Sequence, residues 1–128
     1  MRILMLGDIF GQPGRNALKT RLPDLRQNLA VDLVIGNAEN ASGGVGLTRD
    51  SMVELLAMGI DVLTSGNHIW RHKDVYHSLD KEPRLLRPAN YPPGAPGRGL
   101  GVCTLPDGRQ VAVMNLLGRV FLDTVDCP

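Results

Sequence analysis

The side chains in this sequence whose types and spacing could do chemistry carry oxygen or imidazole groups and come just after short apolar runs. They are Asp8, Asn37, Glu39, Asn40, Asn67 and His68. The apolar runs are residues 3–6, 31–35 (broken only by Asp32) and 60–63, each suited to a buried strand. Open α/β sheets bind their ligands just beyond the carboxyl ends of their strands. The spacing therefore predicts one site assembled from three loops at one edge of a sheet.

Asp8, Glu39 and Asn67 offer the oxygens that a metal site would use. A carboxylate can bridge two metal ions, and neutral amide carbonyls complete an oxygen-rich coordination shell without adding charge. Two metal ions about 3.5–4 Å apart can clamp a phosphoryl group and generate a hydroxide nucleophile. His68, next to Asn67, could then protonate a leaving oxygen as a general acid.

Each of these residues, taken alone, also has a structural explanation. Asp8 could belong to a turn or cap a helix. Glu39 and Asn40 could satisfy backbone groups of a loop, as asparagine often does in turns. His68 could be a packed or capping histidine. Their shared position at strand ends favours the functional interpretation.

The composition is that of an ordinary globular chain. Hydrophobic residues make up 43% and charged residues 21% of its 128 residues, which argues against disorder and fits a single domain over residues 1–128. The formal net charge is +1, so no net field draws the chain to nucleic acid or to an anionic membrane surface. The apolar runs fall short of the roughly 20 residues that span a bilayer, and Asp8 interrupts the first run, so no signal peptide is expected. Cys103 and Cys127 form neither a metal-binding pair nor a disulfide framework, which predicts a reduced, cytoplasmic compartment.

Hydrophobic periodicity predicts alternating strands and helices. The expected elements are a fully buried strand at 2–7, a helix at 15–28 kinked or broken at Pro23, strands at 32–35 and 60–63, a helix from Thr48 to Gly59, a short helix at 74–79, a strand at 84–87 and a hairpin of 101–105 with 110–116. This order predicts the α/β class with parallel βαβ units. His72 and His77 lie in a charged segment and are expected on a solvated helix face. These elements leave one face of the sheet poorly covered, which favours self-association.

Five segments together resemble one known family, the YmdB-like branch of the calcineurin-like metallophosphoesterases. They are residues 7–11, 36–44, 66–70, 87–92 and 97–99, in the family's order along nearly the whole chain. The resemblance implies a metallophosphoesterase-like αββα sandwich with two divalent or trivalent metal ions, such as Fe or Mn. It also implies hydrolysis of phosphodiesters, typically 2′,3′-cyclic nucleotides. By the same resemblance Asp8 and Asn40 bind one metal ion and Asn67 binds the other. Glu39 would bridge the two ions, and His68 would be the acid near the leaving group.

One departure from the family pattern concerns histidines. The family supplies further metal-binding histidines from its carboxyl-terminal half, and no histidine follows His77 here. The chain therefore resembles the amino-terminal part of a metallophosphoesterase domain, with the second layer of the sandwich largely missing. A truncated sequence, a complementing carboxyl-terminal segment on a second polypeptide, and a relic without activity all stay open at this stage.

The sequence thus predicts a metal-dependent phosphodiesterase acting on a small-molecule phosphodiester or cyclic nucleotide. The alternative is a non-catalytic metal- or nucleotide-binding fragment or an interaction module. A homo-oligomer or the complementing carboxyl-terminal segment would cover the open sheet face. Neither a membrane nor strong nucleic-acid binding is expected.

Overall fold

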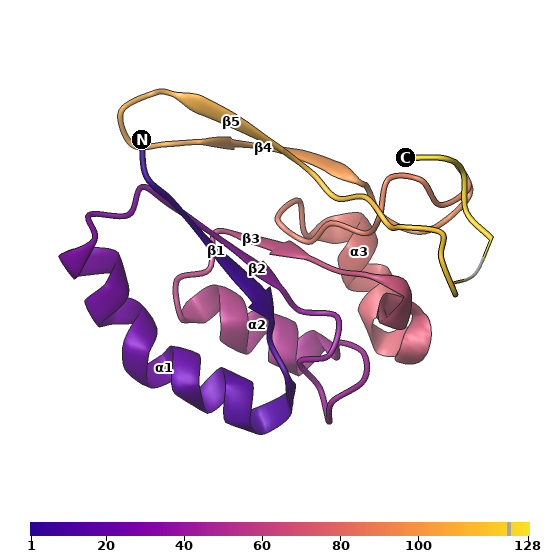
Figure 1. Cartoon of the computed structure of the whole chain (residues 1–128), viewed down its shortest axis with the longest axis horizontal. Helices are drawn as coiled ribbons and strands as arrows, with labels where there is room; N and C mark the ends of the chain where they lie inside the picture. Colours follow the sequence, from indigo (N-terminus) through magenta and orange to yellow (C-terminus); the bar gives the residue numbers. More distant parts are fainter. Residues whose placement is uncertain (123) are drawn as a thin grey trace.

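Three parallel strands form the central sheet of the computed structural model, which describes residues 1–122 and 124–128. β1 (Ile3–Asp8), β2 (Leu33–Asn37) and β3 (Val62–Thr64) lie in the order β1-β2-β3 (Figure 1). The register pairs Met5 with Ile35 and Ile35 with Val62. The predicted α/β class with parallel strands is confirmed. Because the strands are parallel, their carboxyl ends meet at one edge of the sheet.

The strand predicted at 84–87 is present only as isolated bridges. Leu85 pairs with Leu63, and Leu86 pairs with Arg98. Pro88 has no N–H group to donate, so the ladder does not extend further. The segment still continues the sheet beyond β3, since Leu86 N donates to Leu63 O at 2.8 Å.

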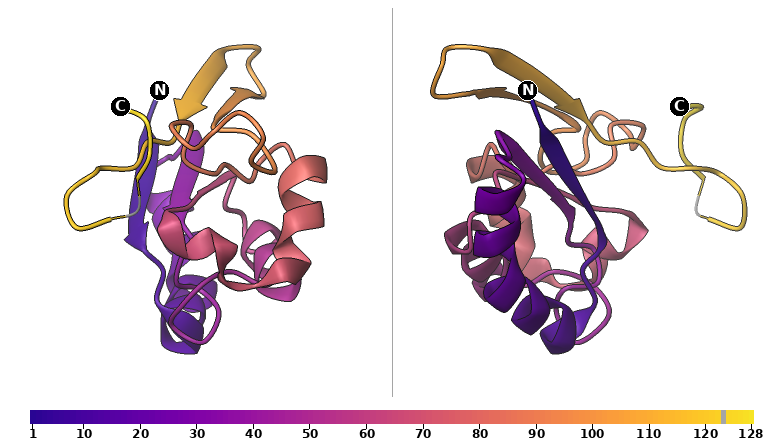
Figure 2. Two further views of the ribbon diagram at one scale, coloured as in Figure 1. Left: turned by 90° about the vertical axis from the view of Figure 1, so that its right-hand side faces the viewer. Right: turned by 60° about the vertical axis from the view of Figure 1, so that its left-hand side comes forward.

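Two helices, α1 (Gly11–Asn28) and α2 (Arg49–Ala57), cover one face of the sheet (Figures 1 and 2). Leu22 of α1 and Leu55 of α2 belong to the same buried cluster as Val34 of β2. α1 begins earlier than predicted and runs as one helix through Pro23, so the predicted break is wrong. Proline removes one main-chain hydrogen bond, and the burial of Leu22 beside it holds the segment helical.

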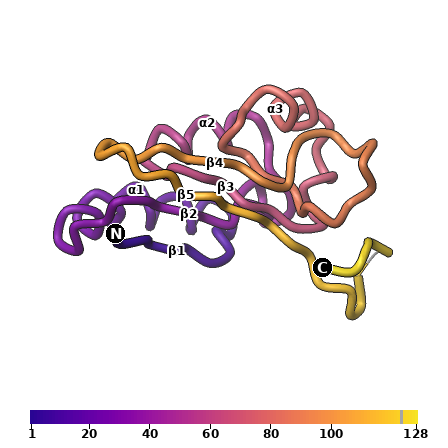
Figure 3. Tube along the Cα trace, turned by 90° about the horizontal axis from the view of Figure 1, so that it is seen from above, coloured from indigo at the N-terminus to yellow at the C-terminus, as the bar shows by residue number. Residues whose placement is uncertain are grey.

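A hairpin of β4 (Leu100–Thr104) and β5 (Gln110–Met114) lies over the other face of the sheet (Figure 3). This confirms the hairpin prediction, with Gly108 at φ +84° in the turn. The residues that join the hairpin to the sheet form a second core. They are Leu33, Ile35, Val62, Leu86, Leu105 and Val113.

β1 is an edge strand, and the prediction that it is fully buried is wrong. The hairpin covers this face of the sheet over β2 and β3 but leaves β1 open. On the open part of the face, Met5 is 74% exposed and Ile3 is 41% exposed. Leu4 and Leu6 point the other way and pack on the main core. The unbroken apolar run of β1 thus has one covered face and one open face.

The chain after β3 winds through two 3-10 turns, η1 (Asn67–Arg71) and η2 (Lys73–Val75), into α3 (Tyr76–Lys81). His77 is exposed on α3, as predicted, whereas His72 lies between the two turns and contacts Val45 O at 3.1 Å. Among the residues that the structure describes, no helix combines the length and the hydropathy needed to cross a membrane.

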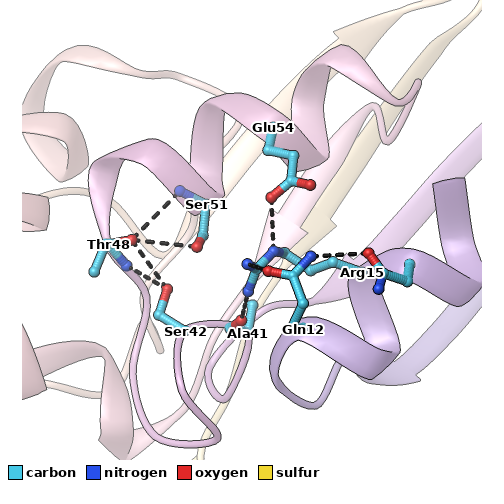
Figure 4. A network of polar contacts seen from close by, with 8 residues as sticks. Gln12, Arg15, Ala41, Ser42, Thr48, Ser51 and Glu54 are labelled. Carbon is cyan, nitrogen blue, oxygen red and sulfur yellow. Dashed lines mark hydrogen bonds and ion pairs between the residues drawn. The ribbon is translucent and has the colours of Figure 1, made fainter.

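Thr48 caps α2, as the sequence predicts. Its Oγ1 accepts from Ser51 N at 3.3 Å, and its N donates to Ser42 Oγ at 2.8 Å (Figure 4). We expect Thr48→Ala to lower the free energy of unfolding by about 1 kcal/mol, because an amide of the first turn loses its partner. Thr48→Ser keeps the hydroxyl and should stay within about 0.5 kcal/mol of the unchanged protein. Urea unfolding followed by circular dichroism measures both, and equal losses would show that the methyl group rather than the cap is responsible.

Candidate functional site

The candidate site lies at the carboxyl edge of the parallel sheet, where the loops after β1, β2 and β3 meet. Asp8 ends β1, and its Oδ2 accepts from Asn40 Nδ2 at 2.8 Å. Asn40 Oδ1 lies 2.6 Å from Nδ1 of His68, the second residue of η1. Asn67 comes directly before His68 and is partly exposed. The structure therefore places these predicted residues at one sheet edge, while their roles as ligands and acid stay predictions.

The hydrogen bonds of Asn40 define how His68 is oriented. An ionised Asp8 carboxylate can only accept, so the NH₂ group of Asn40 faces it. The carbonyl oxygen of Asn40 then faces His68, and a carbonyl can only accept as well. The imidazole must therefore carry hydrogen on Nδ1, which leaves Nε2 as the nitrogen available to a ligand. The His68 side chain is 42% exposed, so a ligand can reach it.

Glu39 is held from two sides. Its Oε1 accepts from Asn37 Nδ2 at 3.2 Å, while Asn37 Oδ1 accepts from Glu39 N at 2.9 Å. A Cβ atom placed on Gly66 would collide with Glu39 Oε2, so the carboxylate occupies the space that a side chain at Gly66 would fill. Glu39 Oε2 also lies 3.8 Å from His68 Nδ1. The glycine before η1 therefore decides where this carboxylate lies.

The loop that carries Glu39 and Asn40 is fixed by main-chain and side-chain contacts. Gly11 N donates to Asn40 O at 2.9 Å. Arg15 of α1 donates to Ala41 O and, at 2.7 Å, to Glu54 Oε2 of α2 (Figure 4). The side chain of Arg15 thus ties both helices to the loop just after Asn40.

From the sequence, Asn37 is one of the oxygen-bearing side chains but has no predicted role, and neither Gly66 nor Arg15 is predicted as a site residue. Asn37 follows a recognisable pattern, since asparagine side chains often bond the backbone two residues further on. No pattern in the sequence marks Gly66 or Arg15 as part of the site. Their importance depends on which side chains the fold brings next to them.

The charges at this edge suit a cation. Within the described part of the chain, neither Asp8 nor Glu39 is paired with a lysine or arginine. The partner of Asp8 is Asn40, and the partners of Glu39 are Asn37 and His68. Two carboxylates and two asparagine amides form an oxygen-rich donor set of the kind that hard cations prefer. Among residues 1–122 and 124–128 there is, however, no group of three or more His, Cys, Asp and Glu side chains placed to hold a metal ion. The described oxygen donors at this edge are of the kind that binds a metal ion, but they are too few to complete a metal site.

A cleft of about 400 Å³ at the opposite end of the sheet is a weaker candidate. It lies beside Arg26, Asp61, Arg84 and Cys103. Arg26 pairs with Asp61 at 3.0 Å, and Arg84 pairs with Glu82, which lowers the pKa of the Glu82 carboxyl. Burial raises the pKa of the Cys103 thiol, so it is not activated as a nucleophile. The arginines at this end of the sheet are already paired with carboxylates, so they offer less to a charged ligand.

A parallel sheet with carboxylate, amide and imidazole groups beyond its carboxyl edge defines an α/β protein whose site is built by strand-end loops. Comparison with known proteins gives the family: the chain belongs to the YmdB-like protein family, whose model matches residues 4–128. The resemblance stated from the sequence is thereby confirmed.

Relatives and solved structures agree with this assignment. A protein of Bacillus subtilis named 2′,3′-cyclic-nucleotide 2′-phosphodiesterase is 42% identical over 128 residues, which is 100% of this chain and 48% of that protein. A crystal structure of a hypothetical protein from Thermus thermophilus matches with a TM-score of 0.91 at 42% identity, covering 100% of this chain and 49% of that one. A crystal structure from Mycoplasma pneumoniae, described as a novel phosphatase, matches with a TM-score of 0.83 at 34% identity, covering 91% of this chain and 42% of that one. The chain therefore spans about half the length of the proteins it matches.

The position of Glu39 can be tested through Gly66. In Gly66→Ala the new methyl group must displace the Glu39 carboxylate, because the space that it needs is occupied. We expect Mn²⁺ to bind about 10- to 100-fold more weakly, the usual effect of disturbing the support of a ligand. Isothermal titration calorimetry measures this loss.

Gly7→Ala is the matched control for that variant. Gly7 lies in β1 next to Asp8, and a Cβ atom there meets nothing within 4 Å. Its Mn²⁺ affinity should equal that of the unchanged chain. Unaltered affinity in Gly66→Ala, or an equal loss in both variants, would contradict the role given to Glu39.

Proposed function

We propose that this chain forms the amino-terminal part of a metal-dependent phosphodiesterase that hydrolyses 2′,3′-cyclic nucleotides. The observation that carries the proposal is the hydrogen-bonded group Asp8–Asn40–His68, with Glu39 beside it, at the carboxyl edge of the sheet. The name of the Bacillus subtilis relative supports the substrate class. The chain itself would act on a small-molecule phosphodiester, since its net charge of +1 offers no strong attraction to nucleic acid.

Two metal ions of the Fe or Mn type would be held by the oxygen donors of this edge. Asp8 and Asn40 would hold one ion, Asn67 the other, and Glu39 both. Such ions supply Lewis-acid polarisation of the phosphoryl group and a nucleophile at neutral pH. The carbonyl oxygen of Asn40 faces His68 with one lone pair, and its second lone pair would bind the ion.

His68 would protonate the leaving ribose oxygen. Its Nδ1 hydrogen is directed at Asn40, so the proton for the leaving group would come from Nε2. The Glu39 carboxylate lies 3.8 Å from the same nitrogen. Both contacts orient the imidazole before a substrate arrives.

We further propose that a complementing carboxyl-terminal segment completes the site. The chain spans 48% of the Bacillus subtilis relative, so a segment of similar length has no counterpart here. The segment would cover exposed apolar residues on the open face of β1 and on the hairpin. They are Ile3, Met5, Leu100, Val102, Met114 and Leu116. A shallow hollow of about 360 Å³ beside Met5, Asp8 and Leu18 continues this surface to the site.

The proposal places the completed enzyme in the cytoplasm. Cys103 and Cys127 are both free cysteines, as a reducing compartment would keep them. The segment would also supply imidazole ligands, because nitrogen donors contribute much of the affinity for Fe and Mn.

The roles of His68 and Glu39 can be separated in the completed protein, obtained by co-expressing this chain with the part of the Bacillus subtilis relative that it does not span. We expect His68→Ala to keep its metal content and to lower turnover of 2′,3′-cyclic AMP by roughly 10²–10⁴, the usual contribution of a positioned proton donor. Glu39→Ala should lose metal and turnover together. Elemental analysis and hydrolysis rates measure the two effects.

A substrate with an activated leaving group sharpens this test. Such a group departs without a proton, so His68→Ala should be partly rescued on bis(4-nitrophenyl) phosphate. His77→Ala, a change of an exposed histidine on α3, is the control and should leave both rates unchanged. Loss of metal from His68→Ala, or equal losses on both substrates, would mean that His68 is a ligand or a structural residue.

The chain alone should be a poor catalyst. We expect 2′,3′-cyclic AMP hydrolysis by residues 1–128 to be at least roughly 10²-fold slower than by the co-expressed pair, because the chain lacks part of its donor set. Met5→Lys, on the apolar surface, should prevent assembly of the pair in size-exclusion chromatography, and Lys19→Glu on α1 should not. A full rate from the chain alone, or a homodimer formed through the same surface, would rule out the complementing segment.

A further inference from the structure

Phe10 is an exposed aromatic residue beside the candidate site. Its side chain is 60% exposed, whereas Ile9 before it is buried. Asp8 and Phe10 are both exposed on either side of the buried Ile9, so their side chains lie on the open side of this segment, about 6–7 Å apart at their backbones.

The ring of Phe10 rests on a glycine of the neighbouring loop. A Cβ atom on Gly44 would lie 2.8 Å from the ring Cζ and 3.3 and 3.4 Å from its two Cε atoms. Gly44 has a φ of +89°, which already favours glycine there. The bond from Gly11 N to Asn40 O joins the two segments next to this contact. The ring is thus supported at its far end and open to solvent elsewhere.

The choice of phenylalanine at this position has a structural cost. Phe10 is the N-cap of α1 and makes no side-chain capping bond. Ser, Thr, Asp or Asn at an N-cap would stabilise the helix, so an aromatic residue forgoes this contribution.

We propose that Phe10 is a stacking platform for the base of the nucleotide substrate. This inference rests on the proposed function, since it takes the phosphate of the substrate to lie at Asp8 and Asn40. The base of a nucleoside 2′,3′-cyclic phosphate bound there would extend over the neighbouring ring. Stacking on an aromatic face tolerates every base, because each base presents a π-face. Phe10 would therefore select for a base without selecting which one.

The test compares two ligands with the full 128-residue chain in the presence of Mg²⁺. One is 2′,3′-cyclic AMP, and the other is methyl ribofuranoside 2,3-cyclic phosphate, which has no base. NMR titration follows the ring protons of Phe10 and the backbone amides of residues 8, 40 and 68. We expect the base-containing ligand to bind at least about fivefold more tightly and to shift the Phe10 ring signals.

Substitutions identify the residue responsible. Phe10→Ala should abolish the difference between the two ligands, and Phe10→Tyr should retain it. Phe121→Ala is the matched control, because it removes a fully exposed phenylalanine from the carboxyl-terminal region and should also retain the difference.

The outcomes that contradict the inference are distinct. Equal affinities for the two ligands, or a preference that survives in Phe10→Ala, would overturn the stacking role and leave the proposed function in place. If neither ligand shifts the amides of residues 8, 40 and 68, either in the chain alone or in the co-expressed pair, the proposed function fails and the stacking role fails with it.

Discussion

One side chain, Asn40, connects the parts of the candidate site. Its amide donates to Asp8 at the end of β1 and accepts from His68 in η1, while its own backbone belongs to the loop after β2. An asparagine amide donates and accepts through rigidly linked atoms, and glutamine, the other amide side chain, is longer. An aspartate here would repel Asp8 and would have no hydrogen to donate. The alignment of three loops depends on this amide, and the contacts of Arg15, Gly11 and Thr48 serve to keep its loop in place.

The two ends of the sheet differ in how their charges are satisfied. At the amino end, arginines and carboxylates pair with one another, as Arg26 does with Asp61. At the carboxyl end, Asp8 and Glu39 have only amides and an imidazole as partners in the part of the chain that the structure describes. Neither carboxylate has a lysine or arginine partner among the described residues, and a bound cation would supply the missing positive charge. This contrast is why the carboxyl edge, rather than the larger cleft, is the candidate site.

The sequence predicted the three strands and the polar residues beyond them because each strand contains a short apolar run, and Asp8, Asn37 and Asn67 follow these runs within a few residues. Thr48 was predicted for the same reason, since a cap is a local feature. Arg15 and Gly66 could not be predicted, because their contacts join residues far apart in the sequence and depend on how helix and loop are placed. Pro23 misled the prediction of α1, where burial of Leu22 outweighs the lost hydrogen bond. β1 misled it differently: its apolar run predicts cover on both faces, and the described residues cover only one. That mismatch is also the physical basis for proposing a complementing segment.

The position at which a metal ion binds on this chain tests the proposed cation site most directly. Mn²⁺ broadens the NMR signals of nearby nuclei, so a substoichiometric titration of the ¹⁵N-labelled protein locates the ion without any need for activity. We expect the amides of residues 8, 39, 40 and 67 and the side-chain amide of Asn40 to broaden first. Signals around Asp61 and Arg84 at the opposite end should stay sharp. Broadening centred on Asp61 and Asp32, or spread evenly over the surface carboxylates, would contradict a cation site at the carboxyl edge of the sheet.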